Sequence, residues 1–269
     1  YTNPADVAAM QAALASVKAS FGKKYPLVID GERIHTEKTI PSINPANPSE
    51  IVGDVSAASL EQANRAIEVA HQRFQTWKNT SAEGRANVLF LAAELVRQRR
   101  YHFNAVLVYE VGKSWVEADA DTAEAIDFLE FYAREALRYA GKHPVVPVVG
   151  EENELRYIPL GVGVVIPPWN FAFAIMAGMT SAALVTGNTV VLKPSSDSAV
   201  IAAWFVDLLH EVGVPAGVVN SIPGNGSVIG DAVVEHSLTR FISFTGSKEV
   251  GLRVNERAAK TLSLIHISE

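Results

Sequence analysis

The chain has 269 residues, of which 48% are hydrophobic, and carries a formal charge of -6 at pH 7. This length and apolar content allow a sizeable core, which excludes an intrinsically disordered protein. The sequence has no basic patch of the kind that binds nucleic acid. No apolar run reaches the roughly 20 residues that a membrane span needs. The first residues show no secretory signal, so we expect a cytoplasmic protein. The sequence contains no cysteine, which excludes disulfides and thiolate metal sites.

The N-terminal residues predict one helix and two hairpins. Apolar residues at helical spacing predict a helix over Thr2–Lys24, for which Asp6 is a candidate cap. Asp30-Gly31 is a typical hairpin turn within Tyr25–Ile34. A second hairpin is expected over Thr39–Val55.

Four helices should follow, and two of them begin with a predicted capping box. Ser59 with Gln62 opens the first, and Thr80 with Glu83 opens the second. Gly141 is expected to end the last as a C′ glycine. The expected helices are Ser59–Trp77, Thr80–Arg100, Phe103–Val111 and Trp115–Ala140.

The remainder alternates strands and helices. Short apolar runs, each followed by a turn and a helical pattern, predict a doubly wound parallel α/β sheet of Rossmann-like type. We therefore divide the chain into an N-terminal helical and hairpin part (1–141), an extended edge ribbon (142–160) and a dinucleotide-binding core (161–261). The prolines of the ribbon exclude a central strand, and the ribbon is suited to pairing with another subunit. The expected strands are Val162–Ile166, Thr189–Leu192, Val218–Ile222 and Leu238–Phe244, and the helices between and after them are Ala172–Thr186, Ala199–Val212, Val228–Val234 and Lys248–Lys260.

Three acidic residues share one face of the long helix, because Glu117, Asp121 and Glu124 are spaced i, i+4, i+7. A solvated acidic stripe is the ordinary interpretation of this pattern. The alternative is that one carboxylate faces a cationic or amine-bearing substrate.

Two glycine-rich turns follow strands and open helices. Gly224-Asn225-Gly226 with Gly230 is one, and Gly246-Ser247 is the other. Both favour a dinucleotide whose pyrophosphate approaches a helix N-terminus, although simple packing remains an alternative. Gly161-Val162-Gly163 lacks the third glycine of a dinucleotide fingerprint and is weak evidence.

Two polar residues at strand ends have a functional and a structural interpretation. Lys193 can bind ribose hydroxyls or a phosphate, or it is a surface lysine. Asn170 can donate to a developing oxyanion, or it is a helix N-cap. The histidines show no paired metal-ligand spacing, so no metal is expected.

Four motifs together resemble the aldehyde dehydrogenase superfamily, in its order and spacing. They are Pro168-Trp169-Asn170-Phe171, the run from Gly187 to Ser195, the run from Gly213 to Asn220 and the run from Phe244 to Gly251. Tyr25 to Arg33 and Glu117 to Tyr132 resemble, more narrowly, the 1-pyrroline-5-carboxylate dehydrogenase branch. That branch oxidises glutamate 5-semialdehyde to glutamate in proline breakdown and implies a homo-oligomer.

The resemblance assigns roles to individual residues. It implies that Asn170 supplies an oxyanion-hole donor, and that Glu124 and Phe171 face the substrate. NAD would be the cofactor, and Ser196 stands where the family often has glutamate, so NADP is expected to be tolerated. The cofactor-binding residues implied are Ile166, Pro167, Pro168, Trp169, Lys193, Ser195, Ser196, Gly226, Gly230, Phe244, Gly246, Ser247 and Val250.

The chain departs from the family where the reaction needs a nucleophile. The family attacks its aldehyde with a cysteine thiolate and hydrolyses the thioester with a glutamate base, and both are missing here. Residues 262–269 do not follow the family pattern. We therefore expect a truncated chain without the catalytic domain, which is inactive alone.

Overall fold

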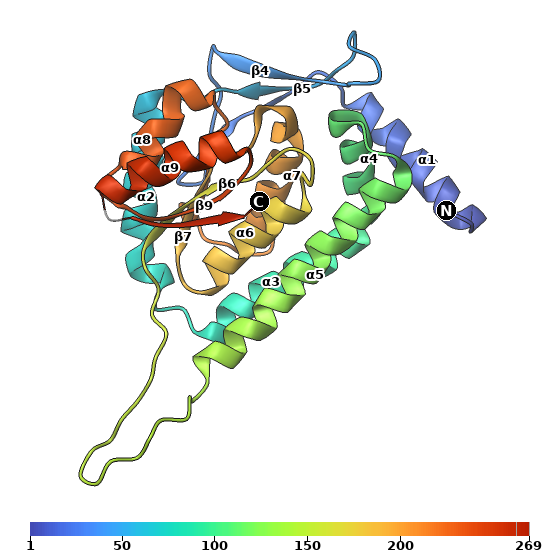
Figure 1. The fold of residues 1–269 in the computed structure, drawn as a ribbon. Helices are drawn as coiled ribbons and strands as arrows, with labels where there is room; N and C mark the ends of the chain where they lie inside the picture. The colour runs from blue at the N-terminus through green and yellow to red at the C-terminus, as the bar shows by residue number, and fades with distance from the viewer. Residues whose placement is uncertain (262, 269) are drawn as a thin grey trace.

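The computed structural model describes residues 1–261 and 263–268, and they form one α/β body with a projecting loop (Figure 1). The N-terminal elements are α1 (Pro4–Ala19), β1 (Lys23–Tyr25), β2 (Leu27–Ile29), β3 (Glu32–Ile34), β4 (Thr39–Ile43), β5 (Ile51–Ser56), α2 (Leu60–Trp77), α3 (Ala82–Gln98), α4 (Arg100–Val111) and α5 (Trp115–Ala140). The remaining elements are β6 (Val162–Ile166), α6 (Ala174–Val185), β7 (Thr189–Leu192), η1 (Ser196–Ser198), α7 (Ala199–Glu211), β8 (Val219–Ser221), η2 (Gly226–Gly230), α8 (Asp231–Glu235), β9 (Thr239–Thr245), α9 (Lys248–Lys260) and β10 (Leu264–Ser268).

The main sheet has the strand order β10-β9-β6-β7-β8-β2-β3, and strands β10 to β8 are parallel. The chain runs outward from β6 through β7 to β8 and then returns to place β9 on the other side of β6. The predicted doubly wound α/β sheet is therefore confirmed. A smaller sheet has the order β1-β5-β4.

Side chains alternate between two cores on the faces of the main sheet. Val190 and Leu192 of β7 belong to the core that contains α6 and α7, whereas Val191 belongs to the core that contains α2, α8 and α9. Both faces of the sheet are covered, and the central strand β6 is accordingly apolar along its whole length. Gly163 is a packing glycine, because a Cβ there would lie 2.2 Å from the Phe241 ring.

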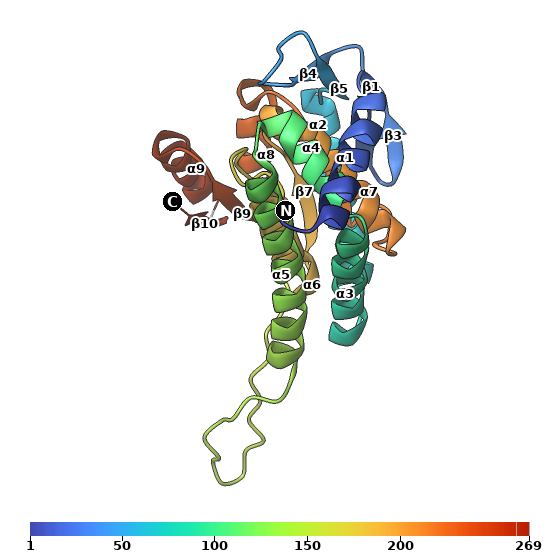
Figure 2. The same cartoon turned by 90° about the vertical axis from the view of Figure 1, so that its right-hand side faces the viewer.

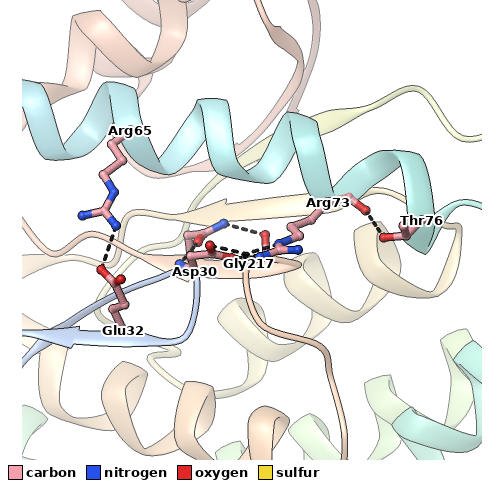
Figure 3. A network of polar contacts seen from close by, with 7 residues as sticks. Asp30, Glu32, Arg65, Arg73, Thr76 and Gly217 are labelled. Atoms are coloured by element: carbon pink, nitrogen blue, oxygen red, sulfur yellow. Dashed lines mark hydrogen bonds and ion pairs between the residues drawn. The ribbon is translucent and has the colours of Figure 1, made fainter.

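The β2–β3 hairpin extends this sheet and is fixed at its turn. Asp30 and Gly31 both have positive φ (54° and 78°), as the predicted tight turn requires. The Arg73 guanidinium donates to both carboxylate oxygens of Asp30 (Figure 3), and the Asn220 side chain accepts from the Asp30 N–H at 2.9 Å. The N-terminal part and the core therefore share one sheet.

Two predicted helix caps lie elsewhere. Helix α1 is capped by the Asn3 side chain, which accepts from the Ala5 N–H, and not by Asp6. The cap of α3 is Ser81, one residue after the predicted Thr80. The capping box of α2, Ser59 with Gln62, is confirmed.

The predicted edge ribbon forms no strand between residues 142 and 160 of this chain. The segment instead projects as a long loop from the end of α5 (Figures 1 and 2). It contains the exposed apolar residues Val146, Val149 and Ile158. Its prolines lack the N–H groups that a sheet ladder uses. Gly141 has φ −71° and ψ 176°, so it is an extended residue and not the predicted left-handed C′ glycine.

Strand β10 lies parallel to β9 at the edge of the sheet, where no strand was predicted. Among the described residues, no helix combines the length and apolar character needed to cross a bilayer.

Candidate active-site cleft

The reversal of strand order between β6 and β9 creates a cleft at the carboxyl ends of the strands. Parallel α/β sheets bind ligands at such switch points, because the loops on the two sides diverge there. The cleft has a volume of about 580 Å³. Its lining brings together most of the predicted site: Ile166, Pro167, Pro168, Trp169, Asn170, Phe171, Ile175, Lys193, Ser195, Phe244, Thr245, Gly246, Ser247 and Val250.

The turn after β6 carries Asn170 at the mouth of this cleft. Two prolines follow Ile166 and restrict the backbone, and Trp169 and Asn170 are exposed. The side-chain Oδ1 of Asn170 accepts from the Phe171 N–H at 3.1 Å, which orients the side chain locally. Asn170 does not cap α6, whose N-cap is Phe173. Its amide group donates to no acceptor within residues 1–261 and 263–268, so it is available to a ligand.

Lys193, directly after β7, is the most unusual group in the cleft. Its residue is only 8% exposed, and its Nζ has a long contact of 3.4 Å to the Pro194 carbonyl oxygen. In the part of the chain that the structure describes, no ion pair contains Lys193. Burial lowers the pKa of the Lys193 ammonium, because the charged form loses its hydration. The predicted surface alternative is therefore wrong.

The turn after β9 supplies the opposite wall. Ser247 is the N-cap of α9, and its side chain accepts from the Val250 N–H. A Cβ at Gly246 would lie 2.8 Å from the Phe244 ring, so glycine is required for this approach. The start of α9 thus offers backbone N–H groups beside the cleft, which favour an anion.

The structure does not bring four of the predicted site residues into this lining. Ser196 lies beside the cleft and lines a neighbouring cavity with Glu110 and Asp197. Gly226 and Gly230 begin and end η2, and a Cβ at either would meet nothing within 4 Å. Glu124 is exposed on α5.

The three acidic residues on this face of α5 have different roles. Glu117 forms a capping box with Ser114, so it stabilises the start of the helix. Asp121 is buried and accepts from the Ala174 N–H at 2.7 Å, so the solvated-stripe interpretation is wrong for this residue. Glu124, on the same face, is exposed, and its carboxylate forms no hydrogen bond or ion pair with the described residues.

Two charged groups near the site escaped the sequence analysis, the half-buried Lys113 and the buried Glu110. Lys113 pairs with Asp121 at 2.9 Å and lies over the Phe171 ring, 4.6 Å from its centroid. Glu110 accepts from Ser42, Val200 and Ile201, and burial raises its pKa to about 7 against these hydrogen bonds. Apart from the pairing of Lys113 with Asp121, these contacts join residues far apart in sequence, so no local pattern indicates them. No group of three or more histidine, aspartate or glutamate side chains within the described ranges is placed to hold a metal ion.

Comparison with known proteins finds one matching family and several similar proteins. The family model described as the aldehyde dehydrogenase family matches residues 33–267. The 1-pyrroline-5-carboxylate dehydrogenase of Geobacillus thermodenitrificans is 57% identical over 260 residues, which are 97% of this chain and 50% of that protein. The enzyme of the same name from Bacillus thuringiensis is 58% identical over 252 residues, which are 94% of this chain and 49% of that protein. The chain spans about half the length of the curated relatives it matches.

A solved structure of 1-pyrroline-5-carboxylate dehydrogenase from Thermus with bound NAD superposes with a TM-score of 0.96 at 46% identity. The match covers 99% of this chain and 53% of that one. Betaine aldehyde dehydrogenase from Staphylococcus aureus in complex with NAD+ gives a TM-score of 0.88 at 28% identity, covering 96% of this chain and 52% of that one.

Proposed function

This chain belongs to the aldehyde dehydrogenase family, and on that premise we propose that it is the cofactor-binding part of an NAD(P)-dependent glutamate 5-semialdehyde dehydrogenase. The reaction would convert the semialdehyde, which is in equilibrium with 1-pyrroline-5-carboxylate, to L-glutamate. The relatives named 1-pyrroline-5-carboxylate dehydrogenase support this assignment, at 57% and 58% identity. A homo-oligomer in the cytoplasm belongs to the same proposal.

The buried Lys193 amine carries the case for a dinucleotide in the cleft. A buried ammonium without a carboxylate partner is costly, and a ligand that brings hydroxyl or phosphate oxygens relieves that cost. The adenosine ribose suits this position, with Ser195 beside it. Gly246, Ser247 and the start of α9 would hold the pyrophosphate. Phe244 and Val250 supply apolar contacts along the same wall.

The nicotinamide end would lie against Ile166, Pro167, Pro168 and Trp169. When bound, the cofactor supplies a hydride acceptor. Asn170 would donate its free side-chain amide to the oxygen of the aldehyde as negative charge develops there. Such a donor is neutral, so it stabilises the charge without transferring a proton.

Glu124 and Phe171 would face the substrate. The exposed Glu124 carboxylate on α5 can hold the ammonium group that distinguishes an amino-acid semialdehyde from a simple aldehyde. Gly226, Gly230 and Ser196 are proposed to contact the cofactor from outside the cleft lining. Ser196 lacks the carboxylate that would repel a 2′-phosphate, so NADP is included as a cofactor.

In the enzyme that we propose, the nucleophile comes from outside these 269 residues, because they contain no cysteine. We therefore propose that the chain alone binds the cofactor and does not catalyse the oxidation. The lack of cysteine also supports an alternative, in which the chain is a non-catalytic binding protein or pseudo-enzyme. Another semialdehyde dehydrogenase of the same family is the alternative within enzymes.

The experiment compares purified 1–269 with the protein expressed from the gene at its full length. We expect NADH formation from glutamate 5-semialdehyde with the full-length protein and none with 1–269. Turnover by 1–269 would refute its assignment as an inactive part. A full-length product that has no cysteine and no activity would establish the non-catalytic alternative.

A further inference from the structure

Helices α6 and α7 begin beside the cleft without a capping side chain of their own. The N-cap residue of α6 is Phe173, which has no side-chain acceptor. The N-cap of α7 is Ser198, whose side chain makes no capping hydrogen bond. Both helix starts are buried, so their free N–H groups cannot be satisfied by bulk water.

Each start is capped instead by a carboxylate from the N-terminal helices. Asp121 of α5 accepts from the Ala174 N–H of α6 at 2.7 Å. Glu110 of α4 accepts from the Val200 and Ile201 N–H groups of α7, at 2.7 and 2.8 Å. A carboxylate at a helix N-terminus is doubly favourable, since it pairs the N–H groups and complements the dipole.

The cap of α6 is tied to the turn that carries Asn170. Ala174 is four residues after Asn170, and Phe171 between them is covered by the Lys113 ammonium. Lys113 in turn pairs with Asp121 at 2.9 Å, and the Asp121 side chain is fully buried. Displacement of Asp121 therefore releases the N–H of Ala174 and the cation above Phe171 together.

The cap of α7 is tied to the turn that carries Lys193. The segment from Lys193 to Ser198 leads directly from β7 into α7, and Ser196 shares a cavity with Glu110. Glu110 also accepts from the Ser42 hydroxyl at 2.9 Å, which anchors it to β4. This anchor holds the start of α7, and with it the ribose end of the cleft.

We propose that Asp121 and Glu110 are positioning residues that set the two ends of the cofactor cleft independently. Asp121 fixes the Asn170 end, and Glu110 fixes the end that contains Lys193 and Ser195. This inference rests on the proposed function for the meaning of the two ends. It predicts separable defects, because the two caps share no residue.

The test uses the full-length protein and gives each variant a specific signature. Glu110→Gln keeps one acceptor oxygen but loses the second, so one α7 N–H loses its partner. We expect the Kd for NAD to rise about 5- to 20-fold, with kcat at saturating NAD changed less than about 2-fold. Asp121→Ala should lower kcat about 10- to 100-fold and leave the Kd for NAD within about 2-fold of wild type.

Asp121→Asn separates the cap from the ion pair. Its oxygen can still accept from the Ala174 N–H, so it should recover most of the kcat lost in Asp121→Ala. Asp127→Asn, an exposed acid on the same helix, is the matched control and should leave both constants unchanged. If Asp121→Ala does not fold, the Lys113→Met, Asp121→Ala double variant removes both partners of the ion pair and provides the same measurement.

Amide hydrogen exchange followed by mass spectrometry gives a readout that does not need activity. Asp121→Ala should accelerate exchange in residues 170–175, and Glu110→Gln in residues 196–202. Exchange that spreads equally over both segments, or equal changes of Kd and kcat in both variants, would overturn the inference. A crossed exchange pattern in a full-length protein that oxidises no aldehyde would support the positioning roles while refuting the proposed function.

Discussion

Replacement of Lys193 by methionine should have opposite effects on cofactor affinity and on stability. Methionine keeps most of the apolar stem and removes the ammonium, which is buried and forms no ion pair within the described residues. A hydrogen bond to a charged group contributes about 1.5–3 kcal/mol, so we expect the Kd for NAD to rise roughly 10- to 150-fold.

The chain without cofactor should become more stable in the same variant. Burial lowers the pKa of Lys193, which means that the folded chain disfavours the charged form. At neutral pH the unfolded state binds this proton more readily, so the group reduces the free energy of unfolding, and Lys193→Met removes that cost. For the same reason the wild-type protein should gain stability, relative to the variant, as pH rises toward the ordinary lysine pKa.

Calorimetric titration with NAD and thermal unfolding of the unliganded protein measure the two effects. Lys260→Met is the matched control, because Lys260 is exposed at the opposite end of α9 and does not line the cleft. It should change the Kd for NAD less than about 3-fold, since exposed charges contribute little. Wild-type affinity in Lys193→Met, or a loss of stability without cofactor, would refute the assignment of this lysine to the ribose.

Three further substitutions test other parts of the site. Glu124→Ala should raise KM for glutamate 5-semialdehyde more than KM for a simple aldehyde, because only the former has an ammonium group; equal effects on both would exclude that role. Ser196→Glu should weaken NADP binding at least about 10-fold more than NAD binding, and a wild-type Kd for NADP about 100-fold weaker than that for NAD would contradict the expected tolerance. Glu110 has a pKa of about 7 in the folded chain against 4.5 ordinarily, so the unfolded state loses this proton first and the free energy of unfolding should fall by roughly 3 kcal/mol between about pH 4.5 and 7. Denaturant titrations should show this fall in wild type and not in Glu110→Gln, and identical pH profiles would contradict it.

Elements with a strong local pattern could be predicted from the sequence. The alternation of apolar strands with helices gave the doubly wound sheet, and Asp30-Gly31 gave the hairpin turn, because both depend on neighbouring residues. The cap of α3 was displaced by one residue, since Thr80 and Ser81 are both capable of capping and tertiary packing selects between them.

Features that depend on distant partners could not be predicted. The capping contact between Asp121 and Ala174 joins residues 53 apart in sequence, and periodicity alone indicated a solvated acid. The bond between Glu110 and Val200 spans 90 residues and has no local signature. The burial of Lys193 likewise follows from elements packed around the end of β7, so the sequence left its surface alternative open.

The central claim is tested most directly by NADH formation from a panel of aldehydes with the full-length protein. The account predicts that glutamate 5-semialdehyde has a kcat/KM at least about 10-fold above that of other semialdehydes, which is about 1.4 kcal/mol of transition-state discrimination. A higher kcat/KM for a semialdehyde without the amino group would contradict it.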